Sequence, residues 1–258
     1  MAIARLLILG GTLAVSFNAS NAAAQSHVHP ITPAGDSAQM TGMADHAMDG
    51  PMDMNMMKHM ALTPSRPATS ADSARARQIA TDLKRAIAKY ADTSVAVADG
   101  YKMFAPNVKN QQVFHFTNYG HGFKEAFRFN AEQPTSLLYK RGADDKLHLV
   151  GAMYTMPKRT KPEKLDERIP LSIAHWHRHV NWCLPKLRDQ SRLAERDSLG
   201  QPKFGPESPV ATKAACDAVG GNFFASPLGW MVHVNVFAGD DLSTIFGDDH
   251  GPHGHAGM

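Results

Sequence analysis

Residues 174–183 read A-H-W-H-R-H-V-N-W-C, and three histidines, His175, His177 and His179, occupy alternate positions in this stretch. Alternate side chains of a β-strand project to the same face. The stretch therefore predicts one long strand from Leu171 to Leu184, with the three imidazoles on one face. The tryptophans between them are expected on the opposite face, toward the core.

Upstream of this strand the sequence changes to a helical pattern. Ile79, Leu83 and Ile87 recur at the spacing of one helical face, and basic residues fall mostly on the other faces. Asp72 or Ser73 is the expected N-cap of this helix. The ordered part of the chain is therefore expected to begin with helix.

Strand patterns and turn residues dominate the rest of the chain. The further expected elements are a short helix between Asp92 and Gly100, strands at 112–117 and 230–237, a hairpin of 136–140 with 146–156, and a short helix near 209–219. Together these patterns predict an α+β fold. N-terminal helices precede a mainly antiparallel sheet, and disordered N- and C-terminal arms flank the domain.

Composition divides the chain into four parts: a signal peptide at 1–24, a disordered Met/His-rich arm at 25–69, a single α+β domain at 70–247 and a His-rich flexible tail at 248–258. The first part has a basic start, an apolar run and small residues before position 25, as secretory signal peptides do. Its apolar run is too short to span a bilayer, and no transmembrane segment is expected in the mature protein. The protein is therefore expected to be periplasmic or secreted.

The net charge bears on nucleic-acid binding, and the cysteine content bears on disulfide formation. A net charge of +3 is too small and too dispersed to favour nucleic acid. Cys183 and Cys216 are the two cysteines, and in an exported protein they are expected to form a disulfide. Ligation of a metal by the Cys183 thiolate is the alternative.

The N-terminal arm concentrates methionine and histidine in an otherwise hydrophilic stretch. Thioether sulfur is a soft ligand that suits Cu(I), and imidazole accepts Cu(I) or Cu(II). At residues 40–60 this composition resembles the Met/His-rich segments of bacterial periplasmic copper-resistance and copper-transfer proteins. Cleavage before Gln25 would also create a Gln25-Ser26-His27 terminus that resembles the amino-terminal copper and nickel motif. The candidate ligands of the arm are His27, His46, Met52, Met54, Met56, Met57, His59 and Met60.

The expected strand that carries His175, His177 and His179, here called the histidine strand, is the second candidate metal site. Two imidazoles at i and i+2 on a strand can converge on one ion, with a further ligand from a neighbouring strand. His233, in W-M-V-H-V-N-V-F, is the expected partner of His175, His177 and His179. A hydrogen-bonded polar cluster without a metal is the alternative. Three further histidines are candidate ligands: His115, His121 and His148. Of these, His148 is a weaker candidate.

Two functional hypotheses follow, and a third is a structural domain with incidental histidines. In the first, the protein binds copper for sequestration, resistance or transfer, with a copper donor or acceptor protein as partner; zinc and iron are the alternative ions. In the second, the histidine strand holds the copper or iron of an oxidase- or oxygenase-type enzyme. P-loop, Rossmann and nucleophile-elbow motifs are missing from the sequence.

Overall fold

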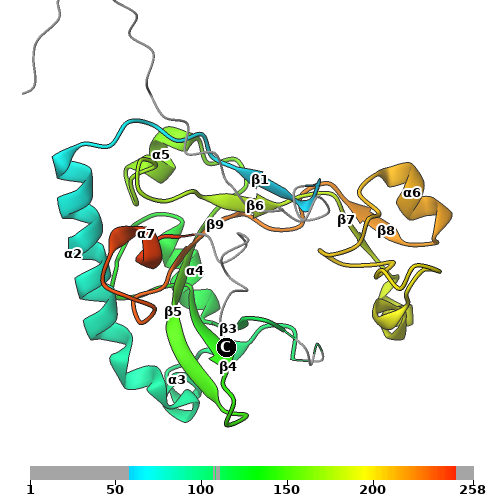
Figure 1. The fold of residues 1–258 in the computed structure, drawn as a ribbon, viewed down its shortest axis with the longest axis horizontal. Helices are drawn as coiled ribbons and strands as arrows, with labels where there is room; N and C mark the ends of the chain where they lie inside the picture. Colours follow the sequence, from blue (N-terminus) through cyan, green and yellow to red (C-terminus); the bar gives the residue numbers. More distant parts are fainter. Residues whose placement is uncertain (1–57, 107, 109–110, 248–258) are drawn as a thin grey trace, which may run out of the picture. The chain divides into compact units, whose positions relative to one another are not determined.

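The computed structural model describes residues 58–106, 108 and 111–247, all within one of the two units into which the chain divides, Met48–Met258 (Figure 1). The elements are, in chain order, β1 (Met60–Leu62), α2 (Ser70–Ile87), η1 (Ala88–Ala91), α3 (Thr93–Ala98), β2 (Lys102–Met103), β3 (Phe114–Thr117), α4 (Tyr119–Glu125), β4 (Ser136–Arg141), β5 (Leu147–Met156), α5 (Pro162–Asp166), β6 (His177–His179), β7 (Trp182–Leu184), η2 (Leu187–Ala194), α6 (Lys213–Ala218), β8 (Asn222–Phe224), β9 (Trp230–Val234) and α7 (Leu242–Ile245). None of the helices described has the length and apolar character that a membrane span requires.

A seven-stranded sheet with the order β1-β6-β9-β5-β4-β3-β2 forms the centre of the fold. Each of its pairings is antiparallel. The expected α+β class is therefore confirmed, as is the hairpin of β4 and β5. The sheet joins strands that are far apart in the sequence, since β9 lies between β5 and β6.

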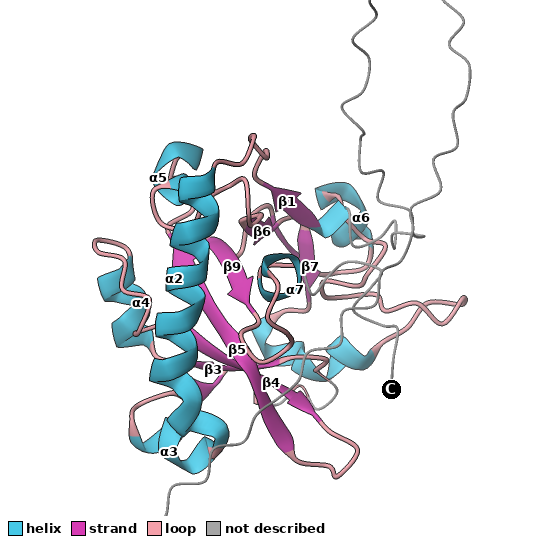
Figure 2. Cartoon of the chain, turned by 60° about the vertical axis from the view of Figure 1, so that its left-hand side comes forward, coloured by secondary structure: helices cyan, strands magenta, loops and turns pink. Residues whose placement is uncertain are grey.

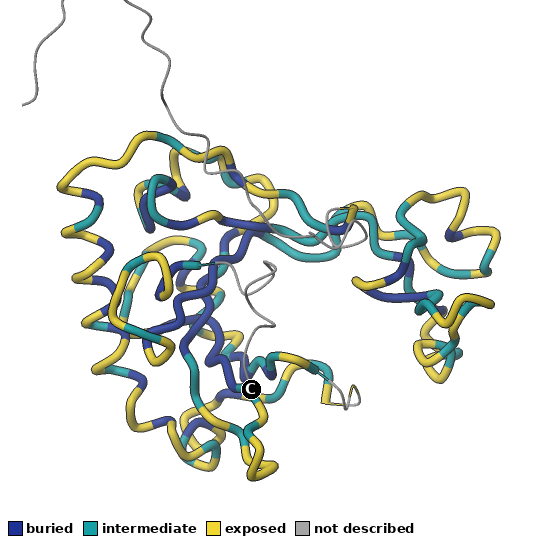
Figure 3. Tube along the Cα trace, in the orientation of Figure 1, coloured by how far each residue is buried: buried dark blue, intermediate teal, exposed yellow. Residues whose placement is uncertain are grey.

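One face of this sheet is covered by α2, which runs along it in Figures 1 and 2. The helix contributes Ile79, Leu83 and Ile87, the residues whose spacing predicted it, to the main hydrophobic core. Strand residues such as Tyr154 and Val232 supply the other side of that core. Buried positions are accordingly concentrated in the central strands (Figure 3).

The N-cap of α2 differs from the expectation. Thr69, with an extended backbone, caps the helix by accepting a hydrogen bond from the Asp72 amide. Asp72 is the third helical residue and returns a bond to the Thr69 amide at 2.9 Å, which completes a capping box. The cap expected for the next helix, α3, is confirmed at Asp92, and Gly100 follows that helix with φ +88°.

The ordered part of the chain begins earlier than the expected boundary at residue 70. Residues 60–62, expected in the disordered arm, form β1 and pair with β6 at the edge of the sheet. The chain between β1 and α2 is also fixed, because the Arg66 guanidinium bonds both Asp72 and Asp166. A three-residue edge strand is too short to show a periodic pattern, so sequence inspection missed it.

The long strand expected at 171–184 is interrupted. Only His177–His179 belongs to the main sheet, and the next strand, Trp182–Leu184, pairs with β8 in a separate two-stranded sheet. Between them Asn181 has φ +58°, which ends an extended strand. Asparagine is among the few residues other than glycine that adopt this left-handed conformation readily.

Cys183 and Cys216 form a disulfide that joins β7 to α6. Phe204 is buried with the two sulfurs in a small hydrophobic cluster separate from the main core. A Cβ at Gly221 would lie 2.5 Å from the Cys183 sulfur, so glycine is required for this close approach. We refer to residues 182–224 as the disulfide lobe.

Candidate functional site

Histidines and methionines share the sheet face opposite the α2 core. His177 of β6 stands opposite Met231 of β9, and His233 of β9 stands opposite Met153 of β5. Directly opposed residues of antiparallel strands project to the same face, and so do residues two apart on one strand. The same rule places Met60, opposite His179, and His115, opposite Leu138, on this face. We call the set the histidine face: Met60, His115, Met153, His177, His179, Met231 and His233.

The imidazole rings of the histidine face form a contiguous series. The ring centroid of His177 lies 5.1 Å from that of His233 and 5.8 Å from that of His179. His115, from β3, is 5.6 Å from His233. Histidines from three strands that are far apart in the sequence are therefore neighbours, and His233 lies between His177 and His115.

The residues at the centre of the histidine face are buried, whereas those at its edges are only half-buried. His177 and His233 are 1% and 4% exposed, and Met153 and Met231 are also buried. The side chains of Met60, His115 and His179 are half-buried. The Trp182 ring packs at 4.8 Å against His179, so this tryptophan lies beside the histidines and not on the opposite face as expected. The turn at Asn181 accounts for the change of side.

Two of the predicted ligands have other contacts. His175 precedes β6, is exposed, and directs Nδ1 to the Thr63 carbonyl oxygen at 3.3 Å, so it does not join the ring series. His59 is buried, and its Nε2 donates to the Ser208 carbonyl oxygen at 2.5 Å. Its Nδ1 lies 3.3 Å from the Val180 carbonyl oxygen. In this arrangement His59 joins β1 to the segment before α6.

The remaining arm ligands fall outside the described residues. They are His27, His46, Met52, Met54, Met56 and Met57. Met60 is the one methionine predicted as a ligand that the structure describes, and it lies next to His179.

Metal binding at the histidine face can be assessed from its donor set and spacing. A metal-bound imidazole has its ring centroid roughly 3 Å from the ion, so two rings on one ion are separated by roughly 5 to 6 Å. The His177–His233 distance of 5.1 Å falls in that range. In the described part of the chain, no three side chains of the types His, Cys, Asp and Glu form a group able to hold an ion. The donor set therefore fits an ion only with thioether ligands, or after the imidazoles rotate.

Sequence inspection missed Met153 and Met231 as candidate donors. Met231 precedes His233 by two residues, which is the strand spacing for one face, so its position was visible in the sequence. Met153 carries no such signal, because its place depends on the register between β5 and β9.

A second group of polar residues lies at α4, which contains the candidate histidine His121. Asn118 caps this helix, which runs from Tyr119 to Glu125. Glu125 is buried, and its carboxylate accepts hydrogen bonds from the Thr135 hydroxyl and the Thr155 amide. Burial raises the pKa of Glu125 to about 8 and lowers the pKa of His121. Glu125 Oε1 is buried without a hydrogen-bond partner.

No family model, curated protein or solved structure matches the chain. The function is therefore inferred from the residues of this chain and their geometry.

Proposed function

We propose that the chain is an exported copper-binding protein whose histidine face holds Cu(I), with the Met/His-rich arm as a second binding region that serves sequestration or transfer. The observation that carries the proposal is the pairing of histidine with methionine across adjacent strands: His177 with Met231, and His233 with Met153. On this face of the sheet, an imidazole thus stands beside a thioether at two neighbouring positions.

The donor types favour copper over zinc and iron. In the described strands, no position on the histidine face carries Asp or Glu. Carboxylates are needed for the two-histidine, one-carboxylate site of non-haem iron enzymes, and thioethers are soft ligands that select Cu(I). A buried donor set of imidazoles and thioethers without carboxylates therefore supports a monovalent soft ion better than a hard divalent one.

Burial supports the same proposal. His177 and His233 are buried and stand opposite Met231 and Met153, which form a small apolar cluster with Leu138. These apolar surroundings would shield a bound Cu(I) from water.

The test uses the mature chain with the arm methionines before Met60 replaced by serine, so that the arm contributes little. We expect this chain to retain Cu(I) in competition with a chromogenic chelator. In that background, replacing His177 and His233 by alanine should weaken Cu(I) binding by at least about 100-fold, because losing groups that merely orient a ligand already costs about 10- to 100-fold.

Two matched controls separate ligation from general damage. His148→Ala removes an exposed histidine that bonds Asp144, and it should leave Cu(I) binding unchanged. Met231→Leu should weaken binding, whereas Met156→Leu, on the core side of β5, should not. Unchanged binding after loss of His177 and His233 would refute the site on the sheet. Absence of copper from the unaltered mature chain would refute the whole proposal.

A further inference from the structure

The helix α4 and the turn that follows it expose three aromatic side chains at helical spacing. Tyr119, Phe123 and Phe127 are 65%, 72% and 75% exposed. The backbone remains helical past the end of α4, since the Arg128 amide bonds the Lys124 carbonyl oxygen at 3.0 Å. Residues four apart therefore lie on one side of this segment. Phe123 and Phe127 make an edge-to-face contact at 5.3 Å. We call Tyr119, Phe123 and Phe127 the aromatic ridge.

Cations accompany the aromatic ridge. Phe123 and Phe127 line a hollow of about 610 Å³, and the exposed charges of its lining belong to Lys124 and Arg128. The acidic residue of that lining, Glu125, is buried, and its raised pKa of about 8 keeps most of it uncharged at neutral pH. The outward electrostatic character of the hollow is therefore positive.

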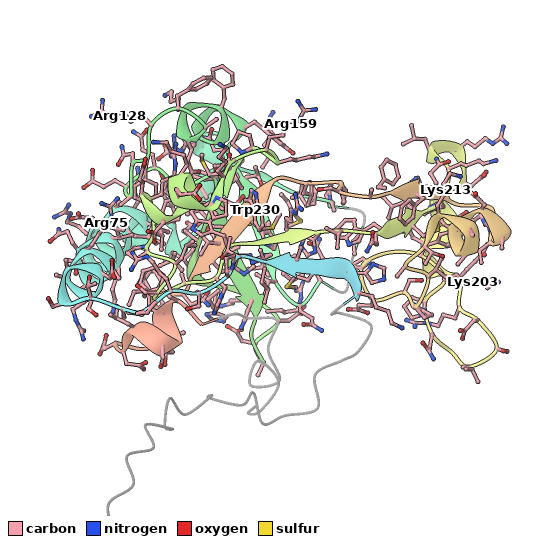
Figure 4. The ribbon with its side chains drawn as sticks, turned by 90° about the horizontal axis from the view of Figure 1, so that it is seen from above. Arg75, Arg128, Arg159, Lys203, Lys213 and Trp230 are labelled. Atoms are coloured by element: carbon pink, nitrogen blue, oxygen red, sulfur yellow. A yellow bond between two sulfur atoms is a disulfide. The ribbon has the colours of Figure 1, made fainter. Side chains whose placement is uncertain are left out.

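A third cation comes from the loop after β5. The Thr155 amide bonds the Glu125 carboxylate at 3.2 Å, which brings the end of β5 next to α4. Arg159, four residues later, is exposed. Arg128 and Arg159 both project at the upper edge of the view in Figure 4. Aromatic rings with Lys and Arg around them are typical of the contact between a protein and an anionic membrane surface, where the rings lie at headgroup level.

We propose that the aromatic ridge, with Lys124, Arg128 and Arg159, docks the protein on a bilayer that contains anionic lipid. The rings enter the interfacial layer, and the cations pair with lipid phosphates. A large exposed aromatic group at three successive turns has no role in the core described above, and insertion into the interface removes its apolar surface from water. The positive surroundings select anionic lipid over zwitterionic lipid.

The experiment is co-sedimentation of the full mature chain with vesicles of phosphatidylcholine, with or without phosphatidylglycerol. We expect binding to the anionic vesicles that weakens as salt is added. Replacing Phe123 and Phe127 by serine should reduce the partition coefficient by about tenfold or more. Each of Lys124→Gln and Arg128→Gln should reduce it by about fivefold on anionic vesicles only. Both aromatic residues are exposed, so these variants are expected to fold.

Matched controls come from the disulfide lobe. Leu187 and Leu199 are 91% and 79% exposed, and replacing both by serine should leave vesicle binding unchanged. A Phe123→Trp variant should shift its fluorescence to shorter wavelength on anionic vesicles. Equal loss of binding in the leucine control, or no binding of the unaltered chain to anionic vesicles, would overturn the proposal. So would a dimer in solution that the Phe123 and Phe127 replacements convert to monomer, because the ridge would then be a protein interface.

Discussion

Glu125 shows how a single residue makes stability depend on pH. Its carboxyl group is buried between α4 and β5, with two hydrogen bonds to one oxygen and none to the other. Loss of hydration raises its pKa to about 8, although hydrogen bonds from Thr135 and Thr155 and the charge of Arg168 oppose that rise. The folded protein therefore keeps the proton over a pH range in which the unfolded chain has released it.

The sign of the effect follows from proton linkage. Between about pH 4.5 and pH 8 the folded state binds the Glu125 proton and the unfolded state does not, so stability decreases as pH rises. The expected slope is at most about 1.4 kcal/mol per pH unit in that window. Glu125→Gln should remove this slope and make the protein more stable than the wild type at pH 8. Urea unfolding at several pH values measures the free energy of unfolding of both proteins and so gives the slope of each.

Glu163→Gln is the matched control, because Glu163 is exposed on α5. It should leave the pH dependence as it is in the wild type. If Glu125→Gln shows the wild-type slope, the buried carboxyl group does not control this pH dependence.

At the scale of elements, Asn181 determines that β6 and β7 belong to different sheets. It has φ +58°, and its side-chain amide donates to the Lys58 carbonyl oxygen at 3.1 Å. Asn181→Val should lower the free energy of unfolding by about 1–2 kcal/mol more than Asn181→Gly, because a β-branched residue is strained in the left-handed region. Both variants lose the bond to Lys58, so the difference isolates the backbone strain. Equal stability of the two would show that the turn does not require positive φ.

Sequence inspection predicted the elements whose patterns are long or whose turns have distinct chemistry. The period of Ile79, Leu83 and Ile87 predicted α2, and Gly142 to Asp145 marked the turn between β4 and β5. Alternation at His177 and His179 was also correctly assigned to one strand. The prediction that His175 lies on the same strand was wrong, because the strand begins at His177. Alternation gives the face of a residue only within the strand.

The candidate site depends on pairings that one strand cannot reveal. His115, His177 and His233 come from three strands, and their contacts follow from the position of β9 between β5 and β6. A sequence pattern specifies which side of a strand is polar, but the order of strands in a sheet is decided by the packing of the whole domain. His233 was expected as the partner of the histidine strand from its own strand pattern, whereas the contact of His115 with His233 required the structure.

At the scale of the whole molecule, the disulfide lobe directly follows β6 in the sequence but packs separately from the histidine face. Cys183 and Cys216 belong to one small hydrophobic cluster, and Met153 and Met231 belong to another. His179 and Trp182 provide the contact between the two regions. Stability of the lobe and the copper binding proposed for the histidine face should therefore respond to different substitutions.

Replacing both cysteines by serine tests this separation. The disulfide spans a sequence separation of 33 residues, and losing such a cross-link should destabilise the lobe by about 3–4 kcal/mol. Amide hydrogen exchange should accelerate in β7 and β8 while β5 and β9 keep their protection. Cu(I) affinity in the chain with the arm methionines replaced should stay within about threefold of its value with the disulfide, since neither sulfur belongs to the proposed site. A large loss of Cu(I) affinity with β9 still protected would show instead that the disulfide lobe and the proposed site are coupled.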